Sequence, residues 1–278
     1  MDLSIQALIM GLVQGLTEFI PVSSSGHLIL VPWAMGWTDP FINSLAFDVM
    51  LHMGTLLALI LYFWRDWLTL IPAGLASIRD RSLRDDPDRK MAWLLVVATI
   101  PAVLVGPLLT DTIESWVREP ARVAAMLCVG AAILWLADRW GSKVREMEEM
   151  TFGGALGIGI AQVVALVPGI SRSGVSIAAG LFEGLSREAA ARFSFLMATP
   201  VVAGAGLWEA RKLLTGEAGE NPEMRLVLIG FVAAATSGVL AIHFMLEFLR
   251  RRPVTLFVVY RVLAAIAVFV ILLSPHGA

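Results

Sequence analysis

The chain has 278 residues, of which 58% are hydrophobic and only 16% are charged. Soluble globular proteins carry about 25% charged residues, so this composition excludes an ordinary soluble protein and predicts an integral membrane protein. The net charge of −2 excludes the basic surface that nucleic-acid binding requires, and the single cysteine, Cys128, excludes an internal disulfide.

Two kinds of apolar segment follow one another along the chain. Residues 1–40 are apolar but are interrupted by the run Pro-Val-Ser-Ser-Ser-Gly-His that begins at Pro21. Residues 150–184 are interrupted in the same way by Pro-Gly-Ile-Ser-Arg-Ser-Gly, which begins at Pro168. The remaining apolar stretches are close to the roughly 20 residues that cross a bilayer, and they predict membrane helices. These helices are expected near 44–64, 91–110, 121–140, 188–212, 224–249 and 254–274.

The two interrupted stretches are predicted to be broken helical hairpins. Proline stops a helix, and Ser- and Gly-rich backbone is tolerated at membrane depth only inside protein or beside a wet cavity. The stretches also match each other: Gly11 corresponds to Gly159, Gln14 to Gln162, Ser23 to Ser171, Ser25 to Ser173 and Gly26 to Gly174. This similarity predicts internal repeats of about 1–140 and 150–278 within a single membrane domain, 1–278.

The expected fold is an all-α integral membrane protein with about six transmembrane helices and two re-entrant broken hairpins. Three helices follow each break, so the second repeat is expected to have inverted topology. Basic residues predict the orientation, because cytoplasmic loops are enriched in Lys and Arg. Loops 65–90, 139–145 and 250–252 hold twelve such residues, against five in loops 111–122 and 211–225. Both termini are therefore expected to face outward.

Glu18 is the main candidate for chemistry in the first broken hairpin. Gln14 and Glu18 are four residues apart, so they share the helix face that points toward the break. Burying an unpaired carboxylate in a membrane costs at least a few kcal/mol, so such a residue is a functional candidate. The alternatives are a glutamate that reaches the interface and one that merely pairs with a structural arginine.

Small hydroxyl residues at both breaks predict helix starts that bind an anion. A turn of this kind leaves backbone N–H groups unpaired and pointing one way, which favours a phosphate. For any single serine, N-capping is the alternative role. His27 follows the first serine run and is a candidate acid/base group, with packing or a structural hydrogen bond as its alternative.

Arg172 lies at the second break, and no other Lys or Arg occurs between Arg145 and Arg187. Its planar guanidinium suits two phosphate oxygens, and the alternative is an internal salt bridge with Glu18. If the repeats pack face to face, a carboxylate, a histidine, an arginine and two helix starts converge, as phosphoryl transfer requires. Asp48 and His52 are weaker candidates to line the same cavity or to hold a metal.

The two motifs resemble the signatures of the bacterial undecaprenyl-diphosphate phosphatases, the bacitracin-resistance family. They read Gly-Leu-Val-Gln-Gly-Leu-Thr-Glu-Phe-Ile-Pro-Val-Ser-Ser-Ser-Gly-His over 11–27 and Pro-Gly-Ile-Ser-Arg-Ser-Gly-Val-Ser over 168–176. The first signature has Glu or Gln, three residues, then Glu, which here are Gln14 and Glu18. The second ends in Thr in the family and in Ser176 here, which keeps the hydroxyl.

The resemblance implies hydrolysis of undecaprenyl diphosphate to undecaprenyl phosphate and inorganic phosphate, which recycles the lipid carrier for peptidoglycan and other cell-wall glycans. It also implies a divalent cation, magnesium or calcium, and a multi-pass location in the bacterial inner membrane with the active site facing the periplasmic or outer side. The expected partners are a polyprenyl diphosphate lipid and the bilayer, without nucleic acid, and a homodimer is left open.

The resemblance also implies roles for residues of both motifs. Glu18 would be the metal ligand or base with Gln14 in support, His27 an acid/base group and Arg172 the clamp on the transition state. The attacking group is either water or a hydroxyl such as that of Ser24. The expected phosphate cradle comprises Ser23, Ser24, Ser25, Gly26, Ser171, Ser173, Gly174 and Ser176.

Two other classes of function stay open at this point. Inverted repeats with broken helices and an anion site at the midplane also describe secondary transporters, including a flippase for the lipid product. An intramembrane serine protease would use the serines and His27, but an arginine between two serines has no obvious use there.

Overall fold

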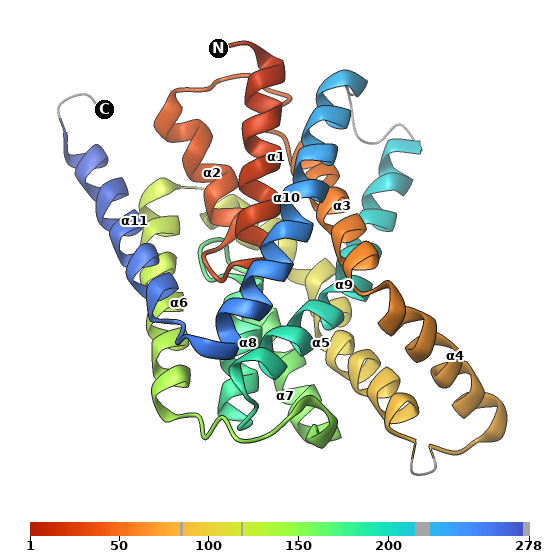
Figure 1. The fold of residues 1–278 in the computed structure, drawn as a ribbon. Helices are drawn as coiled ribbons and strands as arrows, with labels where there is room; N and C mark the ends of the chain where they lie inside the picture. The colour runs from red at the N-terminus through yellow and green to blue at the C-terminus, as the bar shows by residue number, and fades with distance from the viewer. Residues whose placement is uncertain (84–85, 118, 215–222, 275–278) are drawn as a thin grey trace.

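The computed structural model describes residues 1–83, 86–117, 119–214 and 223–274, and most of them are helical (Figure 1). Six of these helices are long and apolar enough to cross a membrane, which confirms the six spans predicted from the sequence. Only α5 differs clearly from the prediction, because it begins four residues before 91 and continues past 110. The spans are α3 (Leu45–Tyr62), α5 (Pro87–Val117), α6 (Pro120–Trp140), α9 (Arg187–Leu214), α10 (Met224–Arg251) and α11 (Thr255–Leu273).

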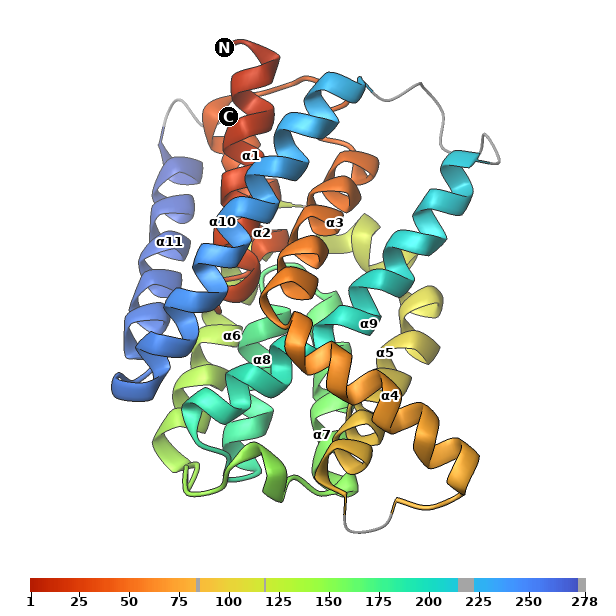
Figure 2. The ribbon, with the colours of Figure 1, turned by 45° about the vertical axis from the view of Figure 1, so that its right-hand side comes forward.

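The two interrupted stretches form helical hairpins, and each of their helices is shorter than the roughly 20 residues that typically cross a bilayer. The first hairpin consists of α1 (Leu3–Phe19) and α2 (Ser24–Met35). The second consists of α7 (Phe152–Val163), the short 3₁₀ helix η2 (Val164–Leu166) and α8 (Arg172–Phe182). The hairpins enter from opposite ends of the molecule and their turns meet near its middle (Figures 1 and 2). Opposite entry is the arrangement that an inverted repeat predicts.

The two turns end in the same unusual N-cap. Ser23 and Ser171 have φ values of 79° and 78°, which non-glycine residues rarely adopt. Each serine Oγ accepts a hydrogen bond from the backbone N–H three residues later, at Gly26 (3.3 Å) and at Gly174 (3.1 Å). The Oγ of Ser23 also accepts the N–H of Gly169 at 3.1 Å, which joins the two turns directly. Such strained conformations persist only where the surrounding structure imposes them.

Each hairpin packs against a span from the other half of the chain. Helix α1 lies along α10 and α7 lies along α5, so the two halves interdigitate. A Cβ atom at Gly11 would overlap the carbonyl oxygen of Gly230, and one at Gly159 would overlap that of Ala98. Small residues allow such close approach between membrane helices. The matching glycines of the two stretches therefore serve the same packing role.

Residues 65–90 were predicted to be a loop, and this prediction was wrong over most of its length. Helix α4 (Trp64–Asp80) follows α3 directly and runs away from the bundle at an angle (Figure 2). Arg65 and Asp66 interrupt the apolar run that ends α3, so the pattern of a membrane span stops there. The helix is instead amphipathic, with apolar side chains spaced three or four residues apart along its exposed face. These side chains are Leu68, Ile71, Leu75 and Ile78.

Candidate active site

A cavity of about 340 Å³ lies where the turn of the first hairpin meets α3, α8 and α9. Its wall combines charged or hydroxyl side chains with apolar ones such as Leu28, Val49 and Val202. The cavity therefore offers a polar region for a charged group and an adjoining apolar region. The polar residues on its wall are Glu18, Ser24, Ser25, Asp48, His52 and Arg172.

Glu18 is the centre of the polar region, and it is only 6% exposed. Its Oε1 accepts a hydrogen bond from Nη2 of Arg172 at 2.6 Å. Its Oε2 accepts one from the Ser24 hydroxyl at 2.5 Å and one from the Gln14 amide at 3.1 Å. The carboxylate therefore contacts a potential nucleophile and a potential phosphate ligand at the same time.

Arg172 is the first residue of α8, so it projects from the start of the second half-helix. Besides Glu18, its guanidinium contacts the backbone carbonyl of Ser194 on α9, to which Nη1 donates at 3.3 Å. The salt bridge that was the alternative interpretation of both residues is therefore present. It does not exclude catalysis, because both side chains also line the cavity.

His27 lies in α2 but does not line this cavity. Its Nδ1 is 2.7 Å from the backbone carbonyl of Ser23, and its Nε2 is 2.7 Å from the hydroxyl of Tyr260. A carbonyl oxygen only accepts, so Nδ1 donates to Ser23, and in a neutral ring Nε2 then accepts from the Tyr260 hydroxyl. These contacts match the structural hydrogen bond that was the alternative for His27, and the acid/base role stays a prediction.

The predicted phosphate cradle is divided by the structure. Ser24 and Ser25 line the cavity, whereas the other six members are buried away from its wall. Ser176 shows what the buried hydroxyls contact: its Oγ donates to the Arg172 carbonyl at 2.7 Å and lies 2.6 Å from Oγ of Ser194. The buried members lie at the N-caps of α2 and α8 or in the first half of those helices. They are Ser23, Gly26, Ser171, Ser173, Gly174 and Ser176.

Asp48 and His52 were ranked behind the motif residues, but α3 brings both of them to the cavity. His52 Nε2 lies 3.6 Å from Oε2 of Glu18, and Nδ1 of the same ring contacts the Asp48 carbonyl at 2.7 Å. Asp48 and His52 are four residues apart, so they lie on the same face of the helix that follows the first hairpin. This spacing was the feature of the sequence that predicted their place beside the cavity.

Sequence reasoning missed Arg261, which is completely buried in α11. Its guanidinium contacts backbone carbonyls of both turns. The argument that singled out Arg172, a lone cation inside an apolar span, applies equally to Arg261. Arg261 lies inside the span predicted over 254–274, but the sequence alone was not used to predict a role for it.

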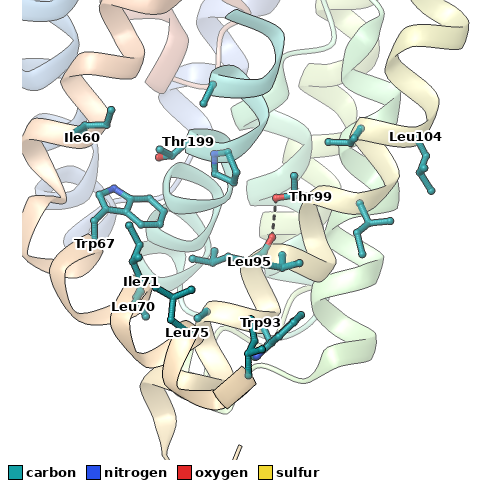
Figure 3. Close-up of a pocket in the computed structure, with 18 residues that line it drawn as sticks. Ile60, Trp67, Leu70, Ile71, Leu75, Trp93, Leu95, Thr99, Leu104 and Thr199 are labelled. Carbon is teal, nitrogen blue, oxygen red and sulfur yellow. Dashed lines mark hydrogen bonds between the residues drawn. The ribbon is translucent and has the colours of Figure 1, made fainter. Parts of the chain in front are cut away.

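A larger cavity of about 730 Å³ lies between α4, α5 and α9 (Figure 3). It is lined by apolar and aromatic side chains such as Trp67, Ile71, Trp93 and Leu104. The described residues that line it include no charged side chain and no histidine, so it offers no acid or base for catalysis. The cavity around Glu18 and Arg172, which contains residues of both motifs, is therefore preferred to this apolar cavity as the candidate active site.

Comparison with known proteins identifies the family of this chain. The family described as bacitracin resistance protein BacA matches residues 7–267. A protein of Desulforudis audaxviator named undecaprenyl-diphosphatase is 44% identical over 268 residues, which cover 96% of this chain and 97% of the relative. Proteins of the same name from Moorella thermoacetica and Rubrobacter xylanophilus are also 44% identical, over 269 and 270 residues. These alignments cover 95% and 97% of this chain, and 97% and 98% of the two relatives. The chain belongs to the bacitracin resistance protein BacA family.

Proposed function

We propose that this membrane protein is an undecaprenyl-diphosphate phosphatase. It hydrolyses undecaprenyl diphosphate to undecaprenyl phosphate and inorganic phosphate, and so recycles the lipid carrier of peptidoglycan and other cell-wall glycans. The observation that carries the proposal is the contact of one buried carboxylate, Glu18, with both Ser24 and Arg172 on a cavity wall. The names of the relatives supply the substrate.

The cavity suits both parts of such a substrate. The diphosphate would lie against Arg172 and the start of α2, where the helix dipole favours negative charge. Arginine carries five N–H donors, and the contacts with Glu18 and Ser194 use two of them. The remaining donors suit phosphoryl oxygens. The first isoprene units would contact the apolar wall near Leu28 and Val202.

The proposed nucleophile is the Ser24 hydroxyl, because Glu18 is within reach of its proton. Glu18 takes that proton as Ser24 Oγ attacks the terminal phosphorus, and the bond to the bridging oxygen breaks to release undecaprenyl phosphate. Arg172 balances the negative charge on the phosphoryl oxygens in the transition state. Glu18 passes the first proton to the departing undecaprenyl phosphate and is again a carboxylate. Water then attacks the phosphorus of the phosphoserine, and Glu18 takes a proton from that water. The bond between Ser24 Oγ and phosphorus breaks, Glu18 returns the proton to Oγ, and inorganic phosphate leaves. Direct attack by water is the competing outcome.

A divalent cation, magnesium or calcium, is part of the proposal. Among the described residues, no group of three or more His, Cys, Asp and Glu side chains could hold an ion without help. Magnesium is commonly bound by one or two carboxylates together with substrate phosphates, and the carboxylates of Glu18 and Asp48 share the cavity wall. These two residues would hold the ion beside the diphosphate, where it would neutralise phosphate charge.

The other motif residues are proposed to act through these groups. Gln14 orients the Glu18 carboxylate through its amide hydrogen bond. His27 acts through Ser23, because both of its ring nitrogens have partners away from the cavity. The six buried members of the predicted cradle hold the turns in shape, and Ser25 joins Ser24 at the phosphate.

The proposed location is the bacterial inner membrane, with the active site open to the outer side. Helices α4, α6 and α10 each end toward the part of the molecule opposite to the N-terminus, and the connections that follow them begin there (Figure 1). These connections belong to the loops that hold most of the basic loop residues, so they are proposed to face the cytoplasm.

Phosphate release by purified protein in detergent tests the proposal. Undecaprenyl diphosphate should yield inorganic phosphate, a chelator should stop the release, and added magnesium or calcium should restore it. Because a detergent solution has no compartments, a protein that only transports the lipid would release no phosphate, and that result would refute the proposal.

Acid quenching followed by mass spectrometry of the peptide that contains Ser24 tests the nucleophile. A phosphorylated Ser24 that appears with substrate and is absent from Ser24→Ala supports the covalent step, with Ser25→Ala as the matched control. Near-normal turnover of Ser24→Ala would assign the attack to water.

A further inference from the structure

Arg261 is the largest fully buried side chain in the described part of the protein. It lies in the first half of α11, inside a membrane span, where a buried cation is costly and usually has a function. Within the described residues no carboxylate forms an ion pair with it. Its partners are backbone carbonyl oxygens.

These carbonyls come from three separate segments of the chain. Nη1 donates to Pro21 in the first turn at 3.2 Å, and Nε donates to Leu127 in α6 at 3.1 Å. Nη2 donates to Gly169 and Ile170 in the second turn, at 2.7 and 2.9 Å. One rigid guanidinium therefore joins both turns to each other and to a membrane span.

Three of these carbonyls lie one or two residues before the strained N-caps. Pro21 is two residues before Ser23, and Ile170 immediately precedes Ser171. Both serines have a positive φ, so their conformations depend on external contacts. Ser24 follows the first cap and Arg172 follows the second, so the position of each turn sets the position of one group that contacts Glu18.

The surrounding helices leave space for this guanidinium. A Cβ atom at Gly130 of α6 would overlap Nη2 of Arg261 and also the Ile170 carbonyl oxygen. A Cβ atom at Gly174 would lie 3.0 Å from Nη1. Glycine at these two positions allows the guanidinium to reach both turns.

We propose that Arg261 is a positioning residue that fixes the two re-entrant turns relative to each other, and thereby holds Arg172 in register with Glu18 and Ser24. This inference rests on the proposed phosphatase function. Arg261 does not line the cavity, so it acts through the turns and not on the substrate. A displacement of about 1 Å in a catalytic group can cost about 10² in rate.

The test is the steady-state kinetics of Arg261→Lys with undecaprenyl diphosphate, normalised to folded protein measured by size-exclusion chromatography and thermal unfolding. Lysine keeps the positive charge, but its single ammonium group cannot donate to carbonyls of all three chain segments as the planar guanidinium does. We expect kcat to fall by about 10²-fold, because Arg172 and Ser24 would be displaced from their positions beside Glu18. KM should change by less than about threefold, because Arg261 contacts none of the residues that form the apolar part of the cavity wall. A kcat close to that of the wild type on folded protein would overturn the inference.

Gly130→Ala is the second variant, since it keeps Arg261 but crowds its guanidinium. Gly130→Ala should lower kcat as Arg261→Lys does. Gly204→Ala is the control and should leave kcat unchanged, because a Cβ atom at Gly204 has no neighbour within 4 Å. If Arg261→Lys does not fold, the kcat of folded Gly130→Ala is the measurement that tests the inference. Normal kcat per folded molecule in Gly130→Ala, or failure of both variants to fold, would make Arg261 a residue of general stability and overturn the inference. Wild-type protein that releases no phosphate would instead refute the proposed function.

Discussion

Glu18 Oε1 and Arg172 Nη2 lie 2.6 Å apart, although 154 positions separate the two residues in the chain. The carboxylate comes from the end of α1, and the guanidinium comes from the start of α8. These helices belong to hairpins that enter from opposite ends of the molecule (Figure 2). The candidate site therefore exists only when the two hairpins are docked against each other.

The two hairpins match in sequence but differ at the positions that carry the chemistry. In the correspondence that pairs Ser23 with Ser171, Ser24 is paired with Arg172. Glu18 is paired in the same way with Leu166, which carries no charge. The first hairpin thus supplies the carboxylate and the hydroxyl, and the second supplies the guanidinium.

Glu18→Gln is expected to lose nearly all phosphatase activity while the protein stays folded. The amide keeps the size of the side chain but cannot take a proton from Ser24 or neutralise Arg172. Phosphate release from undecaprenyl diphosphate measures the effect, and the elution profile of purified protein reports on folding. Retention of more than about a tenth of the wild-type turnover would show that Glu18 is structural.

Gln14→Ala is expected to have a milder effect, a loss of about tenfold in turnover. It removes one hydrogen bond to a charged group, and such bonds contribute about 1.5–3 kcal/mol. The comparison with Glu18→Gln in the same assay is the measurement. A loss as complete as that of Glu18→Gln would mean that Gln14 contacts the substrate or the ion directly.

Gly11→Ala is expected to destabilise the protein by about 1–3 kcal/mol, because the added methyl group would overlap the Gly230 backbone between α1 and α10. The thermal midpoint in detergent should fall. Gly204→Ala is the matched control, since its methyl group meets open space and its midpoint should not fall. Equal midpoints for the two variants would contradict the close packing of α1 on α10.

Cysteine labelling tests the inverted topology. In a variant without Cys128, a cysteine at Ser82 should react only from the cytoplasmic side. A cysteine in 217–220, which lies outside the described residues, should react only from the outer side. Both positions follow from the distribution of basic residues. Labelling of the two from the same side would refute the orientation and the inverted repeat together.

The sequence predicted the parts of the fold that depend on hydropathy and helix-breaking residues. The six spans and both hairpins occur where apolar runs and the breaks at Pro21 and Pro168 indicated. Helix α4 was missed because Arg65 and Asp66 interrupt the apolar pattern. Asp66 instead forms an ion pair of 2.5 Å with Arg192 of α9, a contact that the local pattern does not contain.

The residue types of the site were also predictable, but their orientations were not. Gln14 and Glu18 share a helix face because of the helical period, and this was visible in the sequence. His27 follows the serine run, yet its ring contacts Tyr260, 233 positions later in the chain. The direction of such a side chain depends on tertiary packing, which a motif does not encode. The role proposed for Arg261 could not be predicted either, because all of its hydrogen-bond partners are distant in the sequence.

Arg172→Lys tests the central claim most directly, because it keeps the positive charge and replaces a planar fork with a flexible point charge. Arginines that stabilise a phosphoryl-transfer transition state contribute about 10³ to 10⁵ in rate. We predict that turnover of undecaprenyl diphosphate by folded Arg172→Lys falls by at least about 10²-fold, mostly in kcat, because the clamp should tighten as charge develops. Turnover like that of the wild type would show that Arg172 only balances the charge of Glu18, and would contradict the account of the site.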